Sequence, residues 1–175
     1  MSVKRLSLAN NIFGTLFKTW LLALLIMGSN AFAFTDLDGK KDSIRNHIGK
    51  DKWTIMEIWE SNCPACRMHM PDMVKFDGKL KNARIVGISL DGQNGIEDAE
   101  DFLAEYDVQF PTIITNFVEM NIWMQQNIGE SLVGTPTFIL FDPKGKLVAA
   151  QPGIVSVASL EKFITDNSKP AQAQN

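Results

Sequence analysis

Apolar residues occur along the chain in two kinds of run, which alternate over much of its length. The first kind is short and almost continuously apolar, as expected for a strand buried on both faces of a sheet. The second kind is longer and places apolar residues three or four positions apart, the spacing of a helix with one buried face. The pattern therefore predicts a fold that combines strands and helices.

The continuous runs predict five extended segments. Trp53–Trp59, Arg84–Leu90 and Thr137–Phe141 are expected to be strands of a central sheet. Phe110–Thr115 is a short strand or an extended loop, and Leu147–Ala150 pairs back as a hairpin strand after a turn.

The spaced runs predict helices, and serines mark two of the starts because a serine side chain can cap free backbone N–H groups. Pro71 interrupts the first long helix, since proline removes one helical hydrogen bond and kinks the helix. Early strands that alternate with helices, followed by a hairpin and a closing helix, predict an α/β fold with a mixed central β-sheet flanked by helices. The predicted helices are a short one capped by Ser43 that runs through Ile48, then Ala65–Lys81, Ile96–Tyr106, Phe117–Ile128, and one capped by Ser156 that ends near Asp166.

The N-terminus has the pattern of a secretory signal peptide. Basic residues precede an apolar run over residues 20–27, and Ala31 and Ala33 supply the small side chains that cleavage requires. The run is too short to be a comfortable membrane span, which takes about 20 apolar residues. We therefore predict a signal peptide over residues 1–33, a folded domain over residues 34–167 and a disordered polar tail over residues 168–175.

Such a signal predicts export to the periplasm of a diderm bacterium. The alternative is an uncleaved inner-membrane anchor, if the apolar character of residues 12–17 extends the run across Lys18. A lipid anchor is excluded, because no cysteine lies near the cleavage site. The chain has 17 basic and 20 acidic residues, a net charge of -3, so it lacks the basic excess of a nucleic-acid binder.

The two cysteines of the chain, Cys63 and Cys66, lie between a predicted buried strand and a predicted helix. A helix N-terminus stabilises a thiolate at Cys63, and Pro64 fits the first position of a helix. A structural disulfide would close too small a loop to add much stability. The pair therefore predicts thiol–disulfide exchange, in which Cys63 attacks and Cys66 resolves the mixed disulfide.

Two further side chains near this pair are candidates. Glu57, if buried, would have a raised pKa and could relay the proton of Cys66. The alternative is a strand carboxylate that reaches solvent or pairs with Lys52. His69 could join Cys63 and Cys66 in a Cu(I) or zinc site, and the alternative is a surface histidine.

Together these residues resemble the thioredoxin superfamily and, more narrowly, the exported TlpA/ResA-like thioredoxins. Glu57 and Trp59 stand where the family has a buried acid and a strand aromatic, and Gly134–Thr137 matches the loop whose proline, here Pro136, is cis and faces the disulfide. The resemblance implies a thioredoxin fold, a mixed central β-sheet flanked by helices, with an added N-terminal β-hairpin that begins at Phe34–Gly39.

The resemblance also implies a function, a reductant of protein substrates with disulfides or thiols, supplied with electrons by a membrane donor. It needs no cofactor or metal besides the Cys63–Cys66 disulfide. A cis bond at Pro136 would present the Thr135 backbone beside Cys63, where a substrate chain could form a short β-bridge.

Asn62 departs from the family, most of whose members have Trp there, and makes the rim of the site more polar. Because the Cys63-Pro-Ala-Cys66 motif does not set the direction of electron flow, a disulfide-forming oxidase or isomerase and a copper-delivery protein are the alternatives.

Overall fold

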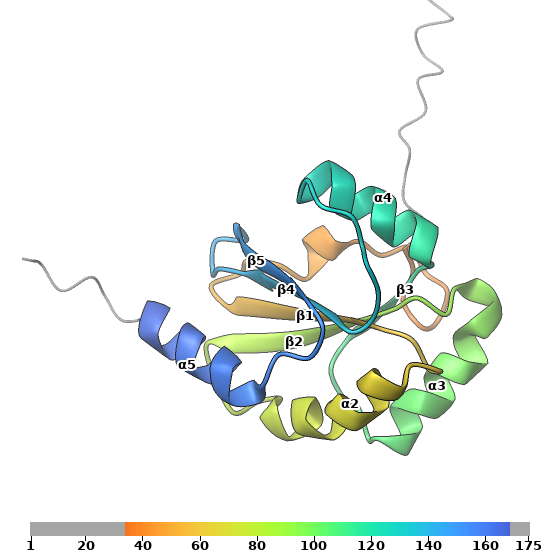
Figure 1. Ribbon diagram of the computed structural model, residues 1–175, viewed down its shortest axis with the longest axis horizontal. Helices are drawn as coiled ribbons and strands as arrows, with labels where there is room; N and C mark the ends of the chain where they lie inside the picture. The colour runs from red at the N-terminus through yellow and green to blue at the C-terminus, as the bar shows by residue number, and fades with distance from the viewer. Residues whose placement is uncertain (1–33, 169–175) are drawn as a thin grey trace, which may run out of the picture. The chain divides into compact units, whose positions relative to one another are not determined.

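The computed structural model describes residues 34–168. The predicted signal peptide, residues 1–33, and residues 169–175 of the predicted tail lie outside the described residues. Five strands form one sheet in the order β3-β2-β1-β4-β5 (Figure 1). The strands are β1 (Trp53–Trp59), β2 (Ala83–Ser89), β3 (Thr112–Ile114), β4 (Thr137–Phe141) and β5 (Leu147–Pro152).

Strand β1 lies at the centre of the sheet, and all seven of its residues are buried. It pairs in parallel with β2 and antiparallel with β4. Strand β3 pairs in parallel with β2, and β5 pairs antiparallel with β4. The sheet is therefore mixed, which confirms the prediction from the sequence.

Helices cover both faces of this sheet. Figure 1 shows α4 and η2 on one side and α2, α3 and α5 on the other. The buried side chains agree, because Met70, Phe102 and Ile164 share one apolar cluster whereas Met120 and Ile44 belong to a second. The helices are η2 (Ile44–Asn46), α2 (Pro64–Phe76), η3 (Gln93–Gly95), α3 (Ile96–Glu105), α4 (Phe117–Asn127) and α5 (Val157–Asn167).

The side chains of β1 alternate between the two clusters, as the pleat of a strand requires. Ile55 and Trp59 pack in the cluster beneath α2, α3 and α5. Met56 and Ile58 pack in the cluster beneath α4. By the same alternation Glu57 faces the α2 side of the sheet, which is the side that carries the cysteines.

Two predicted helix boundaries are wrong. Helix α2 continues through Pro71 but ends at Phe76, not at Lys81. Gly78 follows with a φ of 74°, a left-handed conformation that stops a helix. Ser43 stands at the N-terminus of η2, yet its side chain makes no capping hydrogen bond, and the segment is a single 3₁₀ turn.

The ends of the described chain are tied to the sheet. Thr35 forms isolated antiparallel bridges to Lys41 and to Ile114, so the segment expected as a hairpin contributes bridges rather than a regular strand. Ser168, which the sequence assigns to the tail, accepts a hydrogen bond of 2.9 Å from Trp53 Nε1. Its own hydroxyl donates to the Ile164 carbonyl, so Ser168 belongs to the folded domain.

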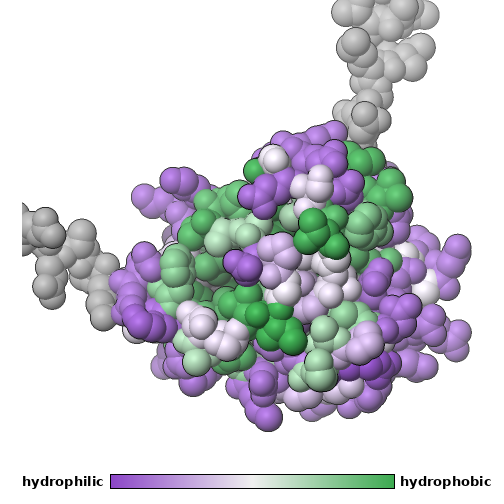
Figure 2. Space-filling model, in the orientation of Figure 1, coloured by the Kyte–Doolittle hydropathy of each residue, from purple (hydrophilic) through white to green (hydrophobic). Residues whose placement is uncertain are grey.

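The surface is mostly polar over the helices. Figure 2 shows hydrophilic side chains along their outer faces and apolar side chains near the middle of the view. An apolar cavity of about 210 Å³ lies between α5 and the sheet, and its walls include Phe138, Leu140, Leu160 and Phe163. Within residues 34–168 no helix is both long and apolar enough to cross a membrane.

Candidate active site

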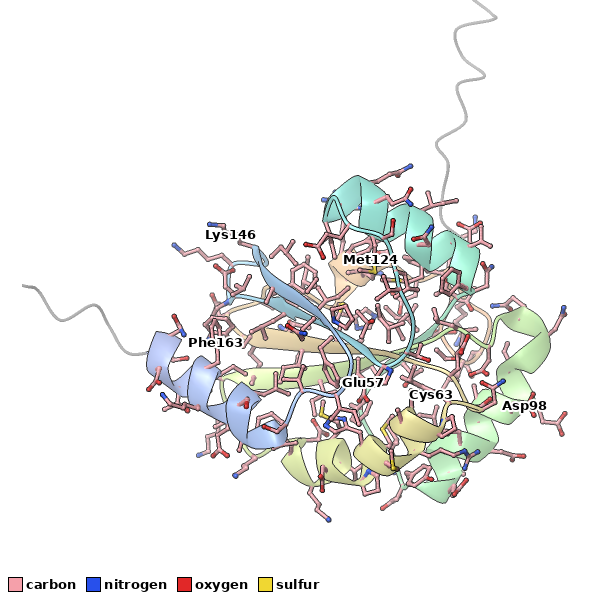
Figure 3. All side chains as sticks on the ribbon, in the orientation of Figure 1. Glu57, Cys63, Asp98, Met124, Lys146 and Phe163 are labelled. Carbon is pink, nitrogen blue, oxygen red and sulfur yellow. A yellow bond between two sulfur atoms is a disulfide. The ribbon has the colours of Figure 1, made fainter. Side chains whose placement is uncertain are left out.

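The two cysteines form a disulfide at the N-terminus of α2, with their Cα atoms 5.3 Å apart (Figure 3). Cys63 is the residue before the helix, and Pro64 is its first residue. The side chain of Cys63 is 7% exposed, whereas that of Cys66 is completely buried. A disulfide or thiol that arrives from solvent can therefore reach Cys63 only.

The backbone around Cys63 favours negative charge on its sulfur. The Cys66 N–H donates a hydrogen bond of 3.1 Å to Cys63 Sγ, and the sulfur lies at the positive end of the dipole of α2. Both interactions stabilise a thiolate once the disulfide is reduced.

Arg67 is less available to that sulfur than the sequence suggests. Its Nε donates to the Ser61 carbonyl at 3.0 Å, and its Nη1 pairs with Glu105 Oε2 at 2.6 Å. The guanidinium also lies over the ring of Phe102, 5.3 Å from its centroid. Arg67 therefore ties the loop before Cys63 to α3, and its charge is shared with Glu105.

The loop before β4 lies against the disulfide. Cys63 Sγ is 3.6 Å from the carbonyl oxygen of Thr135, and the Thr135–Pro136 peptide bond is cis. The Thr137 hydroxyl donates to the Gly134 carbonyl at 2.6 Å, and the Gly153 N–H donates to the Pro136 carbonyl at 2.8 Å. These bonds fix the backbone that faces Cys63.

Asp91 is a site residue that the sequence reasoning missed. Its carboxylate accepts hydrogen bonds from the Ser61 hydroxyl at 2.6 Å, from the Ser61 N–H, and from the Ser89 hydroxyl at 2.7 Å. Ser61 is two residues before Cys63, so Asp91 holds the loop that carries Cys63. A signal was present: Asp91 directly follows the predicted strand Arg84–Leu90, and residues just beyond the carboxyl ends of parallel strands commonly serve the site.

Glu57 and His69 form a buried pair between β1 and α2. Glu57 is 0% exposed and His69 is 4% exposed. His69 Nδ1 lies 3.3 Å from Glu57 Oε1. Within the described residues, the outer atoms Glu57 Oε2 and His69 Nε2 have no hydrogen-bond partner of normal geometry. The alternative for Glu57, a carboxylate that reaches solvent or pairs with Lys52, is therefore wrong. The alternative for His69, a surface histidine, is also wrong.

Burial and pairing act in opposite directions on these two groups. Burial raises the pKa of Glu57, and the hydrogen bond and charge of His69 offset only part of that rise. For His69, burial lowers the pKa, but the Glu57 carboxylate, the backbone of Val155 and the charge of Asp72 together raise it above the ordinary value. Both groups therefore keep a proton to higher pH than they would in water.

The predicted metal alternative finds no support in this geometry. Among residues 34–168 no three His, Cys, Asp or Glu side chains are grouped so that they could hold a metal ion. His69 faces Glu57, and its ring meets Phe138 edge-on at 5.3 Å. Met70 and Met73 are fully buried in the core beneath α2.

Comparison with known proteins decides the family. The model of the AhpC/TSA family matches residues 27–150. The chain belongs to the AhpC/TSA family. The thiol-disulfide oxidoreductase ResA of Bacillus cereus is 30% identical over 134 residues, 76% of this chain and 72% of that protein. The sporulation thiol-disulfide oxidoreductase A of Bacillus subtilis is 24% identical over 135 residues, 75% of this chain and 76% of that protein.

Solved structures agree on the fold of this AhpC/TSA protein. A thiol:disulfide interchange protein of the thioredoxin family from Chlorobium tepidum superposes with a TM-score of 0.62 at 22% identity. The match covers 75% of this chain and 89% of that one. The predicted thioredoxin fold is confirmed, and the chain is a thiol–disulfide oxidoreductase of the ResA type with a Cys63–Cys66 pair.

The pKa shifts of the buried pair predict how stability depends on pH. Unfolded Glu57 loses its proton near pH 4.5, while the folded carboxyl keeps it to higher pH. Between those two pKa values the folded state binds more protons, so raising the pH favours unfolding. His69 acts in the same direction above pH 6.5. We expect the free energy of unfolding of the oxidised protein to fall from pH 5 to pH 8, measured by denaturant titration.

Glu57→Gln should remove most of this slope, because it abolishes one shifted group and the carboxylate that raises the pKa of the other. Glu130→Gln is the matched control, since Glu130 is exposed on the surface. The interpretation fails if the Glu57→Gln variant keeps the slope of the wild type.

Proposed function

We propose that this protein is an exported reductant of disulfides in other proteins. The observation that supports the proposal is the difference in exposure between the two sulfurs. Cys63 is reachable and accepts the Cys66 N–H, whereas Cys66 is completely buried. This arrangement suits a pair in which one sulfur attacks and the other resolves.

The reaction transfers two electrons from the reduced pair to a substrate disulfide. The Cys63 thiolate attacks one substrate sulfur, a mixed disulfide forms, and the other substrate sulfur leaves as a thiolate. The Cys66 thiolate then attacks Cys63 Sγ, which restores the Cys63–Cys66 disulfide and releases the second substrate thiol. A dithiol donor must reduce the pair again, and because the periplasm is kept oxidising we propose a membrane protein as that donor.

We assign the substrate backbone to the loop at Thr135 and Pro136. The Thr135 carbonyl lies 3.6 Å from Cys63 Sγ and is held in place by the bonds at Thr137 and Gly153. A substrate strand that paired with Thr135 would bring its own sulfur to Cys63. Main-chain pairing of this kind accepts many sequences, which suits an enzyme that acts on more than one protein.

Glu57 is the proposed base for the resolving step. Cys66 is a thiol in an apolar environment, so its proton must be removed before the sulfur can attack. Glu57 is the fully buried carboxylate on the central strand, on the face that α2 covers. Proton transfer from Cys66 to Glu57, direct or through one water, would supply the thiolate.

The place of action proposed is the periplasm, reached through the leader of residues 1–33. The basic start, the short apolar run and the Ala31-Phe-Ala33 site support cleavage before Phe34. Expression of the full chain should yield a periplasmic product whose intact mass begins at Phe34. Recovery of the uncleaved chain in the inner membrane would identify the leader as an anchor instead.

The reduction potential of the pair tests the direction of electron flow. Equilibration with dithiothreitol or glutathione buffers should give a value near or below that of thioredoxin, about -270 mV. A value near that of a strong oxidant, about -120 mV, would make the protein a disulfide-forming enzyme.

Two cysteine variants test which sulfur attacks the substrate. Cys66→Ser should accumulate a mixed disulfide with substrate, because the attacking sulfur remains and the resolving sulfur is gone. Cys63→Ser is the matched control and should trap nothing. Trapping by Cys63→Ser would contradict the assignment.

The role of Glu57 is tested by Glu57→Gln, which keeps the shape of the side chain but cannot accept a proton. At pH 7 disulfide exchange should slow by about tenfold or more, within the usual range for loss of a general base. Glu100→Gln, on the exposed face of α3, is the control. Equal rates in Glu57→Gln and the wild type would exclude a relay through Glu57.

A further inference from the structure

The chain has two histidines, and the structure places them in different environments. His47 pairs with Asp42 at 2.6 Å, and both side chains are partly open to solvent. His69 is buried against Glu57, beside the cysteines. The thiol–disulfide reaction proposed above gives His69 no role. Burying an imidazole and a carboxylate side by side destabilises the fold unless the two groups are hydrogen-bonded.

We propose that His69 is a positioning residue that donates a hydrogen bond to Glu57 and orients it, so that the Glu57–His69 pair takes the proton of Cys66 in the resolving step. This proposal rests on the proposed function and adds to it a residue that acts through Glu57. His69 acts through Glu57 and does not itself touch the reacting sulfurs.

The periodicities of α2 and β1 place Cys66, His69 and Glu57 on the same side of the sheet. Cys66 and His69 are three residues apart on α2, so they lie on one face of the helix with their Cβ atoms about 5–6 Å apart. Both are buried, as are Met70 and Met73 on that face. Glu57 faces the same side of the sheet from β1, and its Oε1 is 3.3 Å from His69 Nδ1. The proton acceptor therefore lies next to the turn of helix that carries the donor.

The pairing matters because a carboxylate alone in this position would keep its proton to still higher pH. Burial favours the neutral acid, and a protonated Glu57 cannot accept a proton. The imidazole of His69 offsets that effect by its hydrogen bond and charge. When Glu57 takes up a proton beside the neutral imidazole, the pair carries no net charge, and a neutral pair is the form that a buried site tolerates best.

The thiol proton of Cys66 passes to the Glu57 carboxylate, whose Oε1 accepts the N–H of His69 Nδ1. The electron pair left on Cys66 Sγ forms the new bond to Cys63 Sγ. The bond from Cys63 to the substrate breaks, and the substrate sulfur leaves with its electron pair. That sulfur takes up a proton from solvent, and the pair later releases its own.

Groups from three further segments surround His69. Asp72, on the same helix, favours the protonated imidazole by its charge, and the backbone of Val155, before α5, acts in the same direction. Phe138 of β4 contributes an apolar ring. Glu57 is thus the charged group in direct contact with His69 within the described residues.

Ellman's reagent, 5,5′-dithiobis(2-nitrobenzoate), separates the two steps on the full-length protein. The reduced protein should release two equivalents of the coloured thiolate, the first as Cys63 attacks and the second as Cys66 resolves. His69→Asn keeps an N–H donor near the position of Nδ1 but cannot hold a second proton. We expect it to slow the second phase by about tenfold or more at pH 7 and to move the pH midpoint of that phase upward. The first phase should be unchanged.

His47→Asn is the matched control and should leave both phases and their pH profiles unchanged. The double variant Glu57→Gln/His69→Asn should be no slower in the second phase than Glu57→Gln alone, because the two residues act as one unit. A purely structural role for His69 would lower stability without moving the pH midpoint. If His69→Asn keeps the wild-type midpoint and rate, the proposal is wrong.

A second readout does not depend on activity. In the His47→Asn background the imidazole of His69 gives a single titrating signal in NMR. Glu57→Gln should move its midpoint to lower pH, and an unchanged midpoint would show that the two groups are not coupled. If the wild type releases only one equivalent of the coloured thiolate from Ellman's reagent, Cys66 does not resolve and the proposed function itself fails, which is distinguishable from failure of the pair alone.

Discussion

The position of every group in the site depends on how β1 is held. This strand pairs on both edges and is buried on both faces, so its register cannot shift without exposing apolar side chains. Its last residue, Trp59, stacks on Phe102 of α3 with ring centroids 4.4 Å apart, and the chain then turns into the loop that ends at Cys63. A slip of one residue would turn Glu57 to the α4 side of the sheet and separate it from α2.

The strands and the redox pair could be predicted because their signals are local. Continuous apolar runs mark β1, β2 and β4, and a CxxC motif between a strand and a helix has few other uses. The partner of Glu57 could not be predicted, because its contact with His69 depends on how α2 packs on β1. The end of α2 was misplaced for a local reason: the apolar spacing continues to Leu80, but the backbone at Gly78 is left-handed. Asp91 was missed because its partner Ser61 lies 30 residues away.

The two sulfurs of the disulfide lie in opposite electrostatic environments. Cys63 faces the open end of α2, where a backbone N–H and the helix dipole favour negative charge. Cys66 lies in the apolar cluster beneath α2, and burial there opposes negative charge on its sulfur. The proposed division of work, with attack by Cys63 and resolution by Cys66, would follow from where each residue lies on one helical turn.

The complete burial of Cys66 also affects how the cysteine pair responds to oxidants. Peroxide and similar oxidants from solvent convert exposed thiolates to sulfenic acid and, if nothing intervenes, to sulfinic and sulfonic acids that cannot be recovered. In this protein such oxidants meet Cys63 first. A sulfenic acid formed there would lie within bonding reach of the protected Cys66 thiol, and condensation of the two would restore the disulfide with loss of water. The burial that distinguishes the two sulfurs would then also protect the pair from irreversible oxidation.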